Sequence, residues 1–316
     1  MFPIKRHHLA LEVFLFFVGF SFSIWLHPYY VGGDQEFYRQ LYSELPHIAD
    51  FPDAYGFYRN TVGGIEPGYF ALVRVFSPWV NKDLFFSIVN GVFFAVGLNI
   101  CRRQGIQGWV APFLLVNLYY VSLSFSAERL KVALTLFLIA FLFNGWKRLA
   151  LLLLSVTFHL QIIILLVSYA LWQFVSPAWI RRNILKLLLF GVVAAILAYV
   201  LLSGPLLEYL QSKNEAYQSA GWGGGQALLK PGIFLLLAAI GVREKFRYYV
   251  SISPVLAAAF LFGSERVTIF AFLVFIASCS EGGWSKKLIL MIFLLYYSFN
   301  GVQFIVDFVE RGFSGV

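Results

Sequence analysis

The chain has little charge and almost no cysteine for its length. Only 13% of its 316 residues are charged, whereas a soluble domain carries roughly 25%. Hydrophobic residues make up 60%, which is more than one globular core can bury. This composition excludes an ordinary soluble protein and predicts that lipid surrounds most of the chain. The two cysteines, Cys101 and Cys279, exclude a disulfide framework, and neither has the spacing of a metal ligand.

Common nucleotide-binding and hydrolase motifs are also missing from the sequence. It contains no Walker loop, no Rossmann fingerprint, no His-Glu-x-x-His and no Gly-x-Ser-x-Gly. The net charge of +8 comes from short basic clusters between apolar runs. Such clusters are typical of helix ends at the inner leaflet of a membrane, so nucleic acid is not expected as a partner.

Long apolar runs fill most of the remaining sequence. A membrane-spanning helix needs roughly 20 apolar residues. The runs that reach or approach this length are 9–26, 84–100, 109–126, 130–145, 149–175, 187–203, 227–242, 247–263, 267–281 and 287–306. The first run follows Lys5 and Arg6 but contains Glu12 and lacks a small-residue cleavage site, so we interpret it as an uncleaved span. The sequence therefore predicts a single all-α, polytopic membrane domain over residues 1–316, with about 10–11 membrane segments.

The basic clusters predict the orientation of these spans, because Lys and Arg concentrate on the cytoplasmic side. The clusters assigned to the cytoplasm are Lys5/Arg6, Arg102/Arg103, Lys147/Arg148, Arg181/Arg182/Lys186, Arg243/Lys245/Arg247 and Lys286/Lys287. The N-terminus is then cytoplasmic, and two extracytoplasmic loops cover 27–83 and 204–226. Within the first loop, residues 67–80 are too few to span and should form an interfacial helix. The run 149–175 has basic clusters at both ends, so it should form a re-entrant or broken pair with His159 near its apex.

Two Glu-Arg pairs stand out at the outer ends of apolar runs, Glu128-Arg129 and Glu265-Arg266. Glutamate suits the positive end of a helix dipole, but arginine is opposed by it. The arrangement is favourable if an anion lies between the guanidinium and the free backbone N–H groups, and Lys131 adds a further positive charge. The alternative is a headgroup anchor or a local Glu–Arg ion pair.

Candidate sugar ligands follow the first span. Asp34, Tyr38 and Tyr42 are spaced by four, so a helix places them on one face. A carboxylate beside tyrosine rings suits sugar binding, although helix capping by Asp34 explains part of the pattern. Glu66-Pro67 is a natural start for the interfacial helix, and this local role accounts fully for Pro67 and partly for Glu66.

His159 is a polar residue in an apolar run. A lone histidine on an apolar face is often structural. Within a membrane, however, polar side chains usually face a cavity, so His159 is also a candidate for chemistry.

In these features the chain resembles the EpsG family of Wzy-type O-antigen and exopolysaccharide polymerases. The resemblance rests on Asp34 with Tyr38 and Tyr42, on Glu66-Pro67-Gly68-Tyr69, on Arg129 heading Leu-Lys-Val-Ala-Leu, and on Phe158-His159, with Arg266 extending it towards the C-terminus. Lys131 departs from the family, because relatives often show a neutral polar residue close to that position.

The resemblance implies a GT-C-like fold and an inverting, metal-independent glycosyltransferase without a cofactor, in a bacterial inner membrane. Its substrates would be an undecaprenyl-diphosphate-linked glycan donor and acceptor, joined at the periplasmic face within the membrane lipid. A flippase and a chain-length regulator are candidate further partners.

Roles for the candidate residues follow from this reading. Arg129 and Arg266 are the expected diphosphate ligands, supported by Lys131, because paired cations stabilise a departing diphosphate. The expected base is Asp34, followed by Glu66 or His159. The remaining candidates for substrate binding are Tyr38, Tyr42, Tyr69, Glu128 and Glu265.

Three other classes of protein fit the sequence less well. A glycosyltransferase that takes one sugar from a polyprenyl monophosphate would need a comparable outer cavity. A transporter for an anionic lipid or solute would more often show an inverted repeat, whereas here the charge gathers at one face. A structural subunit of an assembly machine would leave its outer charges scattered.

Overall fold

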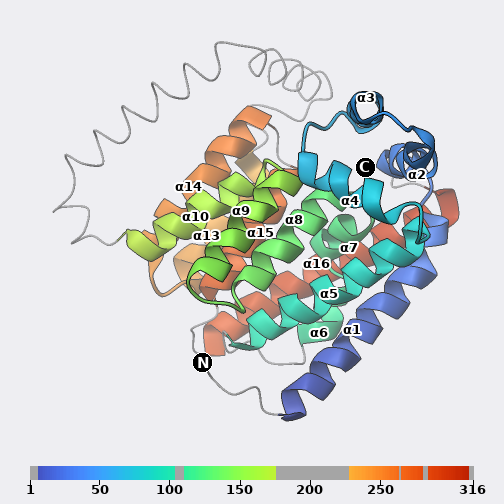
Figure 1. Cartoon of the computed structure of the whole chain (residues 1–316). Coiled ribbons are helices and arrows are strands. Elements are labelled where there is room, and N and C mark those ends of the chain that lie inside the picture. Colours follow the sequence, from blue (N-terminus) through green and yellow to red (C-terminus); the bar gives the residue numbers. More distant parts are fainter. Residues whose placement is uncertain (1–5, 104–109, 176–227, 263–264, 280–283, 313–316) are drawn as a thin grey trace, which may run out of the picture. The chain divides into compact units, whose positions relative to one another are not determined.

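The computed structural model describes residues 6–103, 110–175, 228–262, 265–279 and 284–312, and every regular element among them is helical (Figure 1). The helices form two compact units. Unit 1 comprises Met1–Ile162 and Met291–Val316, and unit 2 comprises Ile163–Leu290. The all-α prediction is confirmed for the described residues. The single membrane domain over 1–316 stays a prediction, because two packing units can belong to one domain.

Three helical stretches in the described ranges are long and apolar enough to cross a membrane. They are Ala10–Tyr29, Lys82–Arg103 and Leu288–Arg311. Ile162–Phe174, Leu229–Gly241 and Val267–Cys279 are apolar but shorter. Several helices therefore have membrane-spanning character, while the larger number of segments and the GT-C-like arrangement stay predictions. The run 187–203 and the loop 204–226 lie outside the described residues.

Unit 1 holds most of the helices that the structure describes. In chain order they are α1 (Arg6–Leu26), η1 (His27–Tyr29), α2 (Asp34–Glu44), η2 (Leu45–His47), α3 (Phe51–Val62), α4 (Pro67–Phe76), α5 (Lys82–Arg103), α6 (Ala111–Leu115), α7 (Leu118–Phe125), α8 (Glu128–Ala140), α9 (Trp146–Phe158) and the later part of α16 (Trp284–Arg311). The predicted spans 9–26, 84–100 and 287–306 each lie within one long helix, α1, α5 or α16.

The polar stretch between α1 and α5 folds into short helices. α2 begins at Asp34, as predicted, after Gly33 with φ 60°, a left-handed conformation that glycine adopts at little cost. α4 begins at Pro67, as predicted, because proline at the first helical position needs no N–H partner. α4 ends at Phe76, so its ten residues span about 15 Å and are too short to cross a bilayer.

One predicted span is interrupted in the structure. In the described part of 109–126 the chain forms two short helices, α6 and α7, and the role of this run as a membrane segment stays a prediction. The break comes at Asn117, whose side-chain oxygen accepts a hydrogen bond from the backbone N–H of Tyr119 at 3.0 Å and caps α7. Gly301 of α16 packs directly on the backbone of Val116 and Asn117, where a Cβ would have no room.

The apolar run 149–175 is also divided, and here the sequence predicts the break. α9 ends at Phe158 and α10 begins at Ile162 and runs to Phe174. His159 lies between them with extended backbone, φ −161° and ψ 119°. α9 packs against α8 and α4, which brings the break close to the start of both helices.

α1 and α5 pack closely through small residues. A Cβ on Gly19 would meet Phe94 at 2.9 Å, and a Cβ on Gly91 would meet Phe16 at 2.8 Å. Close backbone approach of this kind is typical of helix pairs in membranes. Ser23 Oγ also donates to Ser87 Oγ at 3.1 Å between the two helices.

The described part of unit 2 consists of α10, α13 (Leu229–Gly241), α14 (Lys245–Phe262), α15 (Glu265–Cys279) and the first residues of α16. Its interior is largely apolar. Phe234 and Phe275 pack with ring centroids 5.7 Å apart, and the buried Tyr248 hydroxyl donates to the carbonyl of Phe234 at 3.2 Å.

Candidate functional site

Unit 1 buries a group of ionic side chains that we call the arginine cluster: Arg129, Glu66, His159, Tyr58 and Tyr38. Arg129 Nη1 lies 2.8 Å from Glu66 Oε2, and Arg129 Nε donates to the Tyr38 hydroxyl at 3.4 Å. His159 Nδ1 lies 2.9 Å from Glu66 Oε1. All five residues are at most 6% exposed. The cluster therefore joins α2, α3, the start of α4, the start of α8 and the break after α9.

Glu66 is the centre of the arginine cluster. Its Oε2 also accepts from the Ile65 backbone N–H at 3.0 Å and from the Tyr58 hydroxyl at 3.4 Å. Burial opposes ionisation, but the hydrogen bond from His159 and the charge of Arg129 outweigh it and lower the pKa of Glu66 to about 2. An ionised carboxylate only accepts, so Nδ1 of His159 carries a proton. Nε2 lies 3.2 Å from Gln161 Oε1, and it can accept a proton when the Gln161 amide turns its NH2 group, in place of its oxygen, towards the ring.

The position of the Arg129 guanidinium is tightly defined. Its Nη2 donates to the carbonyl of Val62 at 3.2 Å, so all three of its nitrogens are engaged. Gly64 makes room for the group, because a Cβ at Gly64 would overlap Arg129 Nη1 and lie 2.8 Å from Glu66 Oε2. The Gly63-Gly64 turn after α3 is thus part of the site.

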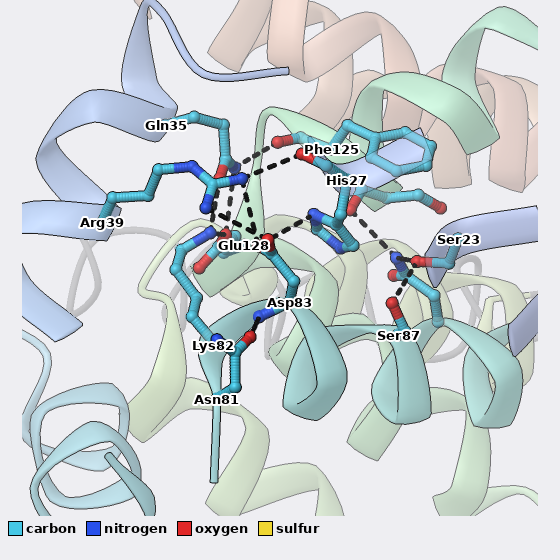
Figure 2. Close-up of polar contacts among 12 residues, drawn as sticks. Ser23, His27, Gln35, Arg39, Asn81, Lys82, Asp83, Ser87, Phe125 and Glu128 are labelled. Carbon is cyan, nitrogen blue, oxygen red and sulfur yellow. Dashed lines mark hydrogen bonds and ion pairs between the residues drawn. The ribbon is translucent and has the colours of Figure 1, made fainter. Parts of the chain in front are cut away.

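A second group, the lysine cluster, adjoins the first and consists of Lys82, Glu128, Gln35, Tyr69 and Lys131. Figure 2 shows Lys82, Glu128 and Gln35 of this cluster. Lys82 Nζ lies 2.6 Å from Glu128 Oε1 and donates to Gln35 Oε1 at 2.5 Å. Gln35 Nε2 donates to Glu128 Oε1 at 3.0 Å and to the carbonyl of Phe125. The Tyr69 hydroxyl donates to Glu128 Oε2 at 2.9 Å. Gln35 and Glu128 are fully buried.

Lys131 is the most enclosed cation of the lysine cluster, with no exposed surface. Its Nζ donates to the carbonyl of Ser124 at 2.8 Å and lies 4.9 Å from the centroid of the Phe86 ring. Lys82 Nζ lies over the same ring at 5.5 Å. The Phe86 ring therefore contacts both ammonium groups, of which Lys82 is the one that pairs directly with Glu128.

The two clusters contain more basic than acidic side chains. In their ordinary protonation states Arg129, Lys82 and Lys131 carry three positive charges, whereas Glu66 and Glu128 carry two negative charges. The ring contact between Tyr38 and Tyr69, with centroids 5.8 Å apart, joins the clusters. A buried cation without a full counter-charge costs several kcal/mol unless an anion binds or the proton leaves. The arrangement is therefore suited to an anion.

A third set of contacts lies beside the lysine cluster. Arg39 donates from Nη1 to Asp83 Oδ2 at 3.1 Å and from Nη2 to the carbonyl of His27 at 2.9 Å (Figure 2). The Nδ1 of the buried His27 lies 3.8 Å from Asp83 Oδ1, and neither ring nitrogen has a hydrogen-bond partner. Arg39 and Asp83 neutralise each other, so this set leaves the charge surplus of the clusters unchanged.

The structure brings most of the predicted site residues together. Glu66, His159, Arg129 and Tyr38 meet in the arginine cluster, and Glu128, Tyr69 and Lys131 meet in the lysine cluster. Asp34, half exposed, begins α2 next to Gln35. Tyr42, on the same face of α2 as Tyr38, packs its ring against Phe86 with centroids 6.3 Å apart, beside the lysine cluster.

The second Glu-Arg pair belongs to unit 2. α15 begins at Glu265, and the side chains of Glu265 and Arg266 lie outside the described residues. The predicted roles of Arg266 as a diphosphate ligand and of Glu265 in substrate binding stay predictions.

Sequence reasoning missed Lys82, Gln35 and Tyr58. Lys82 could have been found, because it directly precedes the predicted span 84–100 at its extracytoplasmic end. The positive-inside rule expects few basic residues on that side of the membrane. Gln35 and Tyr58 carry no such signal, since they are ordinary polar and aromatic residues of short surface helices. Only the folded chain gives them their partners, Glu128 for Gln35 and Glu66 for Tyr58.

These clusters offer two kinds of chemistry, stabilisation of an anion by buried cations and proton transfer at His159. The ionic groups are closed off from water, which strengthens both effects. No family model, curated protein or solved structure matches the chain, so a functional assignment rests on the chemistry of these two clusters.

Proposed function

We propose that this protein is a membrane-embedded glycosyltransferase that joins polyprenyl-diphosphate-linked glycans into a polysaccharide, a polymerase of the EpsG and Wzy type in a bacterial inner membrane. The observation that supports it is the surplus of buried positive charge at the start of α8. Three cations and two carboxylates meet there beside a proton-transfer group, His159.

A lipid diphosphate fits this surplus better than a neutral substrate does. Arg129 lies in the first turn of α8, where free backbone N–H groups and the helix dipole also favour an anion. When the bond between the anomeric carbon and the diphosphate breaks, negative charge grows on the leaving oxygen. Fixed cations in a water-poor site stabilise that charge more in the transition state than in the ground state.

Glu66 has the wrong properties for the catalytic base. Its pKa is about 2, so at neutral pH it would take a proton from a sugar hydroxyl very poorly. In the proposed reaction Glu66 is a positioning residue, which fixes the guanidinium of Arg129 and the ring of His159 at the same time.

His159 is the base in the proposed reaction. The acceptor hydroxyl oxygen attacks the anomeric carbon of the donor, and its proton passes to Nε2 of His159. The carbon–oxygen bond to the diphosphate breaks, and its electron pair stays on the diphosphate beside Arg129 and Lys131. A carboxylate on Nδ1 that orients a histidine for proton transfer at Nε2 is an arrangement that many transferases and hydrolases share.

The test is reconstitution of the protein in nanodiscs with lipid-linked repeat units, extracted from a strain of the source bacterium that lacks the gene. We expect a ladder of products that differ by one repeat unit and release of polyprenyl diphosphate. The same deletion strain should carry single repeat units on its surface in place of long chains. If the protein neither builds a ladder nor releases diphosphate, the proposal is wrong.

The same assay separates the competing functions. Transfer of one sugar from a polyprenyl monophosphate would add a single step and no ladder. A transporter would move lipid-linked repeat units between leaflets without changing their mass. Each of these results would replace the polymerase proposal.

A further inference from the structure

An open groove of about 710 Å³ lies beside the lysine cluster, within unit 1. One wall comes from α2 and η2, with Arg39, Tyr42 and His47, and the other from the turn between α4 and α5, with Ser77, Trp79 and Lys82. The volume falls within the roughly 300–1,000 Å³ of typical small-molecule sites. The groove thus has room for a ligand larger than one sugar ring.

The groove wall contains polar atoms that have no partner. The hydroxyls of Tyr42 and Ser77 and the Nε of Arg39 are buried without a hydrogen bond. An unpaired buried polar atom costs roughly 1–3 kcal/mol, so such atoms usually serve a ligand or bind water. Tyr42 is 7% exposed, and its hydroxyl lies just beneath the groove surface. A ligand that pairs these atoms must carry several hydroxyl or other polar groups and insert between the lining side chains.

Trp79 adds an apolar platform to the same groove. It is 84% exposed, the largest exposed fraction among the large hydrophobic residues of the described chain. An exposed tryptophan can anchor a protein at the membrane interface, but this one lines a polar groove with unpaired hydroxyls. Rigid aromatic rings beside hydrogen-bonding groups suit the pyranose ring, which has apolar C–H faces and polar edges.

The two walls of the groove are held rigidly. Arg74 of α4 donates to the carbonyl of Leu45 at 2.6 Å and to that of Ala49 at 3.1 Å, which fixes η2 against α4. In the opposite wall, Asn81 Oδ1 accepts from the Asp83 N–H at 2.8 Å and caps α5. The groove is therefore formed before a ligand arrives.

The groove leads to the proposed reaction site through Lys82. This residue lines the groove and also pairs with Glu128 of the lysine cluster (Figure 2). We propose that the groove binds the sugar chain of the acceptor, with a ring stacked on Trp79 and hydroxyl groups paired with Tyr42 and Ser77. This inference rests on the proposed polymerase function, and it assigns the acceptor glycan to the groove as its binding site.

The experiment measures binding of free oligosaccharides, released by mild acid from the surface polysaccharide of the source bacterium, to the protein in nanodiscs. Trp79→Ala should weaken binding about tenfold or more, because it removes the stacking surface. Tyr42→Phe keeps the ring on Phe86 and removes only the hydroxyl, so it should weaken binding about fivefold. Trp146→Ala is the matched control, because Trp146 is 75% exposed and begins α9, outside the groove.

The polymerisation assay is run in parallel on the same variants. Trp79→Ala and Tyr42→Phe should raise the KM for the acceptor and leave the kcat at saturating acceptor nearly unchanged. If the oligosaccharide binds the wild type but neither groove variant weakens it, the groove proposal is wrong while the polymerase function stands.

Two further outcomes are decisive. If no oligosaccharide binds although the wild type still builds a ladder, the groove proposal alone falls. If phosphatidylglycerol in the nanodisc, and not the oligosaccharide, changes the tryptophan fluorescence of the wild type but not that of Trp79→Ala, the groove holds a lipid headgroup and the proposal is overturned.

Discussion

The two clusters of unit 1 and the described ion pair of unit 2 differ in burial. In unit 1, the lysine and arginine clusters bury ion pairs whose side chains are at most 8% exposed. In the described part of unit 2, the ion pair between Arg247 and Glu244 lies one helical turn apart, with side chains 36% and 47% exposed. An exposed pair within a helix contributes only about 0.3–0.5 kcal/mol.

This contrast distinguishes buried residues that packing alone explains from buried residues that need a functional reason. The apolar interior around Phe234, Tyr248 and Phe275 needs no function to explain it, since burial of aromatic surface is favourable in itself. Buried ionic groups need a further reason, because replacing them by apolar residues is often neutral or stabilising. The reason we propose is the binding of a lipid diphosphate.

The largest expected effect is that of Arg129→Ala. It leaves Glu66 and His159 without their central cation and removes a proposed diphosphate ligand, so polymer synthesis should fall more than 100-fold. Breaking a buried ion pair also costs about 3–5 kcal/mol of stability. The measurement is polymer length in a complemented deletion strain, with protein level measured in the same membranes.

A conservative variant and a control from unit 2 accompany this test. Arg129→Lys keeps the charge but lacks the planar fork that holds Glu66, Val62 and Tyr38 together, so it should accumulate normally and make short polymer. Arg247→Ala should leave polymer length unchanged. Full-length polymer from Arg129→Ala at normal protein level would contradict the proposed role.

Lys131→Met tests whether the lysine is needed for activity and not for stability. Methionine has a similar volume and removes a buried ammonium whose hydrogen bond goes to a single carbonyl, that of Ser124. The apparent melting temperature in detergent should therefore stay the same or rise by a few degrees. Polymer synthesis should fall at least tenfold, because the positive surplus disappears. Lys245→Met, on the exposed start of α14, should change neither quantity, and an active Lys131→Met would make the lysine a structural residue only.

Local patterns in the sequence predict several of these features well. Proline at position 67 and Asp34 after two glycines mark the starts of α4 and α2. Basic clusters on both sides of 149–175 predict the break at His159. In each case neighbouring residues along the chain carry the physical cause.

Features that depend on distant packing could not be predicted. Asn117 interrupts an apolar run, and the place of the break depends on Gly301, far along the chain, packing against it. Arg129 pairs with Glu66, which lies 63 residues away in the sequence, and this buried ion pair was not predicted. The sequence predicts that these charges matter, but not that they neutralise each other.

The next effect concerns pH and the Glu66 carboxylate. Its pKa falls from 4.5 to about 2 on folding, because the hydrogen bond from His159 and the charge of Arg129 outweigh the cost of burial. A lowered pKa stabilises the folded state fully above pH 4.5, and this stabilisation is lost as the pH falls from 4.5 towards 2. Its size is about 3 kcal/mol.

Thermal unfolding in detergent between pH 7 and pH 3 measures this loss. The melting-temperature difference between wild type and Glu66→Gln should be constant from pH 7 to pH 5 and shrink below pH 4.5. Glu244→Gln, from the exposed pair of unit 2, is the matched control and should follow the wild type at every pH. A difference that stays constant down to pH 3 would show that Glu66 is not held by buried partners.

The smallest expected effect comes from one methyl group at Gly64. A Cβ there would overlap Arg129 Nη1 and lie 2.7 Å from the Tyr58 hydroxyl, so Gly64→Ala must displace the guanidinium and should cost about 2 kcal/mol. Gly56→Ala is the matched control in α3, because a Cβ at Gly56 meets nothing within 4 Å. It should stabilise the helix slightly. Melting temperatures and polymer lengths of both variants measure the difference, and equal values for the two would mean that the guanidinium is free to move. In that case the buried charges of unit 1 would be no more constrained than the exposed pair of unit 2.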